Sequence, residues 1–152
     1  MGWQTSVHTA SGFSFSYPIM FSGHVWGPTV WPVMLVFVPQ GQDPLKACPD
    51  LQNSGNPMTS IQGKTSGGLS YTLYKNTDIG AGSLYATYCY VIQGKTHSYV
   101  FDFTIRSHSG CGAGECGAYC DTPNEEECRN LDRVKTIEEP LNQIVASFKL
   151  LK

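Results

Sequence analysis

LYATYCYVI at residues 84–92 and HSYVFDFTIR at residues 97–106 are two regular runs of the chain, and QGKT at residues 93–96 joins them. Both runs are rich in aromatic and β-branched side chains, which favour strands, and the joining segment is short and polar. The pattern predicts a β-hairpin. Glycine at the first of two central positions is typical of a type II′ turn, so we expect Gly94 and Lys95 to be the turn residues.

This turn fixes the register of the predicted hairpin, because each further pair follows by counting away from it. Both faces of the hairpin then carry apolar side chains, so we expect both to be covered over at least part of their length. His97 and Asp102 fall on opposite faces, which excludes a catalytic dyad between them within the strand. The predicted pairs are Tyr90 with Tyr99, Tyr88 with Phe101, Cys89 with Val100, and Thr87 with Asp102.

Four more strands are predicted before the hairpin. Trp3–His8 and Phe13–Tyr17 are β-prone runs around a small polar segment with one glycine, which indicates an N-terminal hairpin ending at Pro18. Val30–Val38 is almost entirely apolar and predicts a strand covered on both faces. Leu69–Lys75 alternates between larger apolar and smaller polar residues and predicts a further strand of the main sheet.

The other segments predict a loop, two helices and a final strand. Residues 39–64 are rich in Gly, Pro, Asn, Gln and Ser and predict a long loop that is functional, contains a short helical turn, or is cross-linked through Cys48. Thr122–Glu125 has the pattern of a capping box and predicts a short helix carrying Cys128. Ser147–Leu151 predicts a short strand. Before it, an apolar stripe after Glu138, Glu139 and Pro140 predicts a helix, and its members are Leu141, Ile144, Val145 and Phe148.

The composition is that of one folded domain and gives no support to nucleic-acid binding. The chain has 152 residues, of which 41% are hydrophobic and 14% charged. Its formal net charge of -2 is too small to draw it onto phosphate backbones or an anionic membrane. The longest apolar run near the N-terminus, Val33–Val38, is far shorter than the roughly 20 residues that cross a bilayer, so no transmembrane segment is predicted.

Two segments carry a family resemblance, GFSFSYP at residues 12–18 and NQIVASFK at residues 142–149. They resemble the PsbP-like superfamily, and more narrowly uncharacterised exported bacterial domains with a GFSFxYP opening and an ILSSFK-like C-terminus. The resemblance implies an α+β fold over residues 1–152, in which helices flank an antiparallel sheet as an α/β/α sandwich. Members mostly serve as assembly or partner-binding subunits without shared catalytic residues. The Cys-rich insert at about residues 108–130 departs from the photosynthetic members and argues against a photosystem role.

Six cysteines in a chain of this length are typical of an oxidising compartment. Four of them crowd into residues 111–128, a segment without an apolar core, where we expect disulfides to hold the chain and predict at least two bridges in all. Zinc ligation with His108 is the alternative, but paired CxxC motifs are missing, and we predict neither a metal nor another cofactor. Among about 15 pairings we favour Cys48 with Cys89, by exclusion alone. The cysteines are Cys48, Cys89, Cys111, Cys116, Cys120 and Cys128.

No catalytic motif stands out among the polar residues. Histidines and carboxylates are scattered, and no G-x-S-x-G motif presents a nucleophilic serine. Core packing explains the aromatic residues as well as a sugar-binding platform does. Glu125–Glu127 fit a solvated first helical turn better than a cation site. The residues considered are His8, His24, His97, His108, Asp43, Asp78 and Asp102 for a hydrolytic set, and Trp3, Trp26 and Trp31 for a platform.

These observations favour a secreted or cell-envelope binding or structural module over an enzyme. The expected partner is an unidentified protein or cell-surface component, and self-association is compatible with the sequence. Met1 and Gly2 are typical of a start codon and a cloning residue, so we expect an export signal or lipid anchor to have been removed. The alternative is a small secreted hydrolase or carbohydrate-active protein, which convergence of His24, Asp43 or Asp50 with a serine in one pocket would favour.

Overall fold

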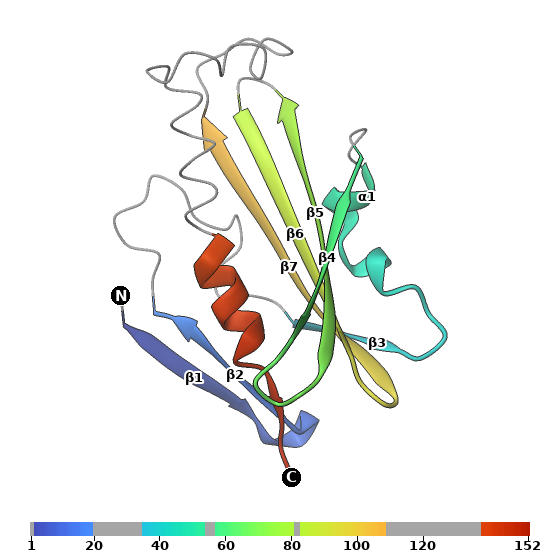
Figure 1. The fold of residues 1–152 in the computed structure, drawn as a ribbon, viewed down its shortest axis with the longest axis vertical. Helices are drawn as coiled ribbons and strands as arrows, with labels where there is room; N and C mark the ends of the chain where they lie inside the picture. The colour runs from blue at the N-terminus through green and yellow to red at the C-terminus, as the bar shows by residue number, and fades with distance from the viewer. Residues whose placement is uncertain (1, 20–34, 54–56, 81–82, 109–137) are drawn as a thin grey trace.

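The described residues form two antiparallel sheets with short helices packed against the larger one (Figure 1). The computed structural model describes residues 2–19, 35–53, 57–80, 83–108 and 138–152. The larger sheet has the strand order β3-β7-β6-β5-β4, and the smaller sheet has the order β1-β2-β8. The strands are β1 (Trp3–His8), β2 (Phe13–Pro18), β3 (Leu35–Pro39), β4 (Thr59–Lys64), β5 (Ser70–Gly80), β6 (Ser83–Gln93), β7 (His97–His108) and β8 (Lys149–Leu150). The helical segments are η1 (Thr9–Ser11), η2 (Pro44–Ala47), α1 (Pro49–Asn53) and residues 138–146.

β6 is the central strand of the larger sheet, and its side chains enter two separate cores. Strand alternation sends Tyr88, Tyr90 and Ile92 to one face and Cys89 and Val91 to the other, and all five are buried. The first core lies between the sheet, β2 and the C-terminal helix, whereas the second includes residues of η2 and α1. Both faces of the hairpin are therefore covered, as predicted.

The predicted register of this hairpin is wrong by two residues. The N–H of Gly94 donates to the carbonyl of His97 at 3.0 Å, so Gly94 lies opposite His97 and the two central residues of the turn are Lys95 and Thr96. The carbonyl of Thr96 accepts a hydrogen bond at 3.0 Å from the N–H of Gln40, just after β3. Gly94 also lacks the positive φ that a type II′ turn requires. A shift of two leaves each side chain on its predicted face, so His97 and Asp102 remain on opposite faces. The observed pairs are Tyr90 with Phe101, Tyr88 with Phe103, Cys89 with Asp102, and Thr87 with Thr104.

The C-terminal helix, residues 138–146, brings the predicted apolar stripe into the first core. Figure 1 shows this helix between β2 and the larger sheet. All four members of the stripe are fully buried, which confirms the prediction; they are Leu141, Ile144, Val145 and Phe148. The strand predicted after the helix is β8, which pairs with the start of β2.

Polar contacts fix the same helix to the larger sheet. The hydroxyl of Tyr90 donates to Asn142 Oδ1 at 2.6 Å, and that of Tyr88 donates to Glu138 Oε1 at 3.1 Å. Lys75 Nζ also lies 3.1 Å from Glu138 Oε1 and forms an ion pair with it. Burial raises the pKa of both tyrosines, so each hydroxyl keeps the proton that it donates.

Two segments before the hairpin differ from their predictions. In the described part of the chain, β3 is an edge strand paired with β7. Val36 and Val38 pack in the second core and Leu35 packs against the first, but Phe37 is 43% exposed, so the cover predicted for both faces of Val30–Val38 is incomplete. Residues 39–64 contain the short helical segments and the Cys48 cross-link that were predicted as alternatives, but they also contain β4. The sequence of β4, TSIQGK, has no apolar alternation, and its conformation comes from pairing with β5.

The coarse fold class, α+β with antiparallel sheets and few helices, is confirmed. The Cys-rich insert and the helix predicted at Thr122–Glu125 lie outside the described residues, as do Trp26, Trp31 and His24. In the described part of the chain, no helix is long and apolar enough to span a bilayer.

Candidate functional site

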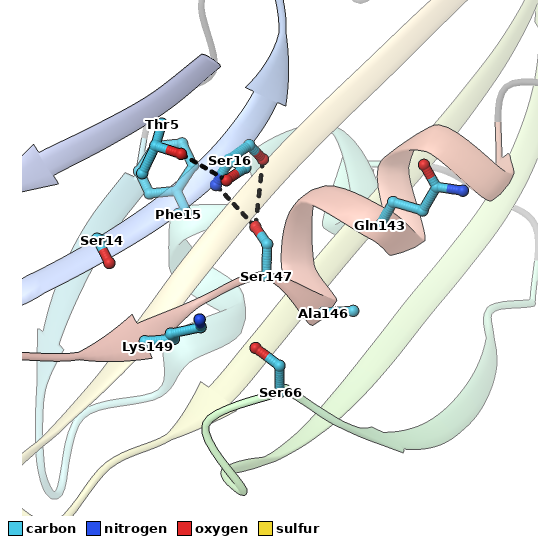
Figure 2. A pocket seen from close by; sticks show the side chains of 9 residues that line it. All are labelled: Thr5, Ser14, Phe15, Ser16, Ser66, Gln143, Ala146, Ser147 and Lys149. Atoms are coloured by element: carbon cyan, nitrogen blue, oxygen red, sulfur yellow. Dashed lines mark hydrogen bonds between the residues drawn. The ribbon is translucent and has the colours of Figure 1, made fainter. Parts of the chain in front are cut away.

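A groove of about 420 Å³ opens between the smaller sheet and the end of the C-terminal helix (Figure 2). Phe15 and Ala146 supply its apolar wall, and the rest of the lining is polar. Three separate parts of the chain contribute: the N-terminal hairpin, the turn between β4 and β5, and the C-terminal segment. The polar lining residues are Thr5, Ser14, Ser16, Ser66, Gln143, Ser147 and Lys149.

The GFSFSYP segment forms β2 and places serines in the groove. Successive side chains of a strand point to opposite faces, so Phe13 and Phe15 enter the first core while Ser14 and Ser16 point the other way. β1 pairs with β2 along its whole length, which confirms the predicted N-terminal hairpin and sets Thr5 opposite Ser16. Their hydroxyl oxygens lie 2.9 Å apart.

Ser147 holds the end of the helix against β2. Its Oγ accepts a hydrogen bond from the backbone N–H of Ser16 at 2.7 Å and donates to the carbonyl of Ile144 at 2.6 Å. On the other side, the N–H of Ser66 donates to the carbonyl of Ala146 at 2.6 Å. These bonds fix the positions of the three segments that line the groove. The hydroxyl of Ser147 both accepts and donates within the protein, so its hydrogen is not free for a ligand.

Three polar side chains in the groove are free of hydrogen bonds to the other described residues. Within the described residues, neither the hydroxyls of Ser14 and Ser66 nor the amine of Lys149 makes a hydrogen bond or ion pair. Ser14 and Lys149 are direct cross-strand neighbours in the pairing of β2 with β8. Figure 2 shows the Lys149 amine between the hydroxyls of Ser14 and Ser66 in this view. The groove therefore offers donors and acceptors to a ligand.

Of the histidines and carboxylates singled out from the sequence, those whose side chains the structure describes do not gather at this groove. His8 Nε2 lies 2.8 Å from Ser6 Oγ on exposed β1, and its ring stacks on Phe13. Asp43 caps η2 by accepting a hydrogen bond from the N–H of Leu45 at 3.0 Å. Neither residue lines the groove.

His97 lines a separate hollow of about 270 Å³, together with Ser11, Phe37 and Tyr99. No carboxylate of the described residues lines this hollow, and the imidazole Nδ1 of His97 bonds to the hydroxyl of its neighbour Thr96 at 2.9 Å. In the described part of the chain, the structure therefore does not bring a histidine, a carboxylate and a serine together. Asp78 lies elsewhere, in β5.

Asp102 occupies a different position, on the face of β7 toward α1. Its Oδ1 is buried and has no hydrogen-bond partner among the described residues. Asp50, in the first turn of α1, accepts a hydrogen bond from Thr104 Oγ1 at 2.9 Å. Burial, together with repulsion from Asp50, raises the pKa of Asp102 to about 6. The ionised form of Asp102 is therefore unfavourable in the folded protein.

Asp102→Asn should stabilise the protein at about pH 7.5 and change little at about pH 4. The pKa of Asp102 is about 6 in the folded protein against an ordinary value of 3.8, so the folded state holds the proton more tightly. The free energy of unfolding of the wild type should therefore fall as pH rises through this range. Because Asp102 is partly exposed, we expect a gain of about 1–2 kcal/mol, less than the full shift implies.

Urea unfolding of both proteins at the two pH values measures this effect. Asp43→Asn is the matched control, because Asp43 is a carboxylate at the protein surface and asparagine also caps helices. We expect no gain from it at either pH. A gain from Asp102→Asn of the same size at both pH values would contradict the assignment, since it would come from something other than ionisation.

Among the described residues, no group of histidine, cysteine and acidic side chains could hold a metal ion. Of the six predicted site cysteines, Cys48 and Cys89 form a disulfide, as favoured, and the other four lie outside the described part. The groove itself was missed from the sequence. The alternation of serine with phenylalanine in GFSFSYP was the available signal, but Ser66 and Lys149 reach it only through the fold.

Comparison of the chain with protein-family models finds no match. Comparison with curated proteins finds no significant match either.

Proposed function

We propose that this protein is a secreted or cell-envelope binding module, and that the groove beside β2 is its ligand site. The uncommitted polar side chains of Ser14, Ser66 and Lys149 are the observation that carries this proposal. Binding sites are concave and contain a few well-placed polar groups on a rigid frame, and here hydrogen bonds between backbone segments supply that frame. The Cys48–Cys89 disulfide supports an oxidising compartment.

The fold proposed for this module is a PsbP-like α/β/α sandwich. Helical segments pack on both faces of the larger sheet, with residues 138–146 on one face and η2 and α1 on the other. The GFSFSYP segment and the C-terminal helix, which carry the family resemblance, both contribute to the first core. This arrangement supports a binding role, since PsbP-like members mostly act as partner-binding subunits. No observation on the described residues favours the hydrolase alternative.

A ligand screen by NMR tests the groove as the binding site. We expect a mixture of monosaccharides, amino acids and small carboxylic acids to shift the amide signals of Ser14, Ser66 and Lys149 most strongly. Ser14→Tyr should remove these shifts, because the larger side chain fills the groove. Ser60→Tyr is the matched control, since Ser60 is exposed on β4 away from the groove. Shifts that gather instead at the hollow of Phe37, His97 and Tyr99 would overturn the proposed site.

A further inference from the structure

We propose that the groove and the adjoining outer face of β1 bind a saccharide chain that contains an acidic sugar unit, an inference that rests on the proposed function of the groove. In this arrangement, Trp3 stacks on one sugar ring. Hydroxyl and amide groups of the groove hydrogen-bond the neighbouring unit. Lys149 forms an ion pair with the acidic group.

Trp3 lies on the same face of the smaller sheet as the groove. Side chains two residues apart in a strand share a face, so Trp3 points to the same side as Thr5, which lines the groove. The pairing of Trp3 with Pro18 and of Thr5 with Ser16 agrees with this placement. Two residues along a strand correspond to about 7 Å, so Trp3 follows Thr5 at that spacing on the face that the groove shares. Trp3 is 39% exposed, which leaves part of the indole open to a ligand.

An exposed indole beside a row of hydroxyls suits a sugar. A sugar ring has an apolar face that can stack on an aromatic ring and a rim of hydroxyls that both donate and accept hydrogen bonds. The hydroxyls of Ser14 and Ser66 likewise donate and accept, and the amide oxygen of Gln143 accepts, while its nitrogen donates to Glu139 at 3.5 Å. β1 and β2 contain no Asp, Glu, Lys or Arg, so this surface matches a ligand that is polar but mostly uncharged.

Lys149 adds a preference for an acidic unit. It is exposed, and it is the only charged residue that lines the groove in the described part of the chain. Among the described residues, no carboxylate lines the groove; Glu139 lies outside the lining and accepts a hydrogen bond from Gln143 Nε2 at 3.5 Å. A single positive charge in a concave polar surface attracts an anion. A carboxylate on the sugar unit next to the stacked ring would form an ion pair with the Lys149 ammonium.

Isothermal titration calorimetry of the full chain with hexagalacturonate and with neutral maltohexaose tests the proposal. We expect hexagalacturonate to bind more tightly and its affinity to fall with added salt. Trp3→Ala should weaken both interactions roughly tenfold, the scale of a lost aromatic contact. Lys149→Gln should weaken hexagalacturonate binding about fivefold, as for an exposed ion pair, and leave maltohexaose binding unchanged.

Two variants away from the groove serve as matched controls, Phe37→Ala for the exposed aromatic residue and Lys95→Gln for the exposed lysine. Neither should change the affinity for either oligosaccharide, and thermal melts check that each variant is folded. Equal affinities for the two oligosaccharides, or an affinity for hexagalacturonate that Lys149→Gln leaves unchanged, would overturn the proposal that the ligand contains an acidic sugar unit.

If neither oligosaccharide binds, or if Trp3→Ala leaves the binding unchanged, the proposal that the ligand is a saccharide is overturned. The proposed function of the groove would then still have its own test, because the NMR mixture also contains amino acids and carboxylic acids. Shifts caused by those compounds at Ser14 and Ser66 would keep the groove as a binding site for another ligand class. Failure of both experiments would overturn both proposals.

Discussion

Phe148→Ala is expected to lower the free energy of unfolding by about 3–5 kcal/mol, a large part of the 5–15 kcal/mol by which domains are typically stable. The ring of Phe148 is fully buried and lies where the two sheets and the helix meet. Its centroid is 4.9 Å from that of Tyr99, 5.6 Å from that of Phe13 and 6.2 Å from that of Phe101. Removing the ring leaves a cavity that all three elements border.

Urea unfolding followed by circular dichroism measures this loss. Phe37→Ala is the control, because Phe37 is also aromatic and also contacts Phe13 and Tyr99 but is 43% exposed on an edge strand. We expect it to cost about 1 kcal/mol or less. A chain truncated after Glu139 should lose cooperative melting altogether. If that chain still melts near the full-length temperature, the helix is peripheral, and the resemblance to PsbP-like proteins loses its main support.

Features that depend on local periodicity could be predicted from the sequence. The period of two in β6 and β7 placed Tyr88 and Cys89 on opposite faces, and that placement survived the error in register. The spacing of three and four between Leu141 and Phe148 likewise identified the buried side of the helix. In both cases, the side chains that are buried follow from the geometry of a single element.

Features that depend on contacts between distant segments could not be predicted. The central residues of the hairpin turn are Lys95 and Thr96, and the carbonyl of Thr96 bonds to the N–H of Gln40 after β3, a contact that the hairpin sequence does not contain. β4 is a strand because β5 lies beside it, although its own residues give no strand pattern. The groove combines Ser14, Ser66 and Lys149 from three separate segments, and no spacing in the sequence relates them.

Removal of the Cys48–Cys89 disulfide is expected to destabilise the protein by about 4 kcal/mol. The two cysteines are 41 residues apart, and a cross-link of this span restricts the unfolded chain by about that free energy. The disulfide also joins α1 and η2 to β6 within the second core, where Leu51 is buried as well. Urea unfolding of the Cys48→Ala/Cys89→Ala variant measures the effect, and its m-value should rise because the unfolded chain exposes more surface.

Leu51→Ala separates the cross-link from packing, because it removes a buried side chain from the same core and leaves the disulfide in place. We expect this variant to lose stability, by about 2–4 kcal/mol, with an unchanged m-value. A double cysteine variant with the stability and m-value of the wild type would contradict the argument. The second core lies on the face of β6 opposite to the C-terminal helix. The double variant should therefore retain ligand binding at the groove wherever it remains folded, since the residues that line the groove belong to the other side of the sheet.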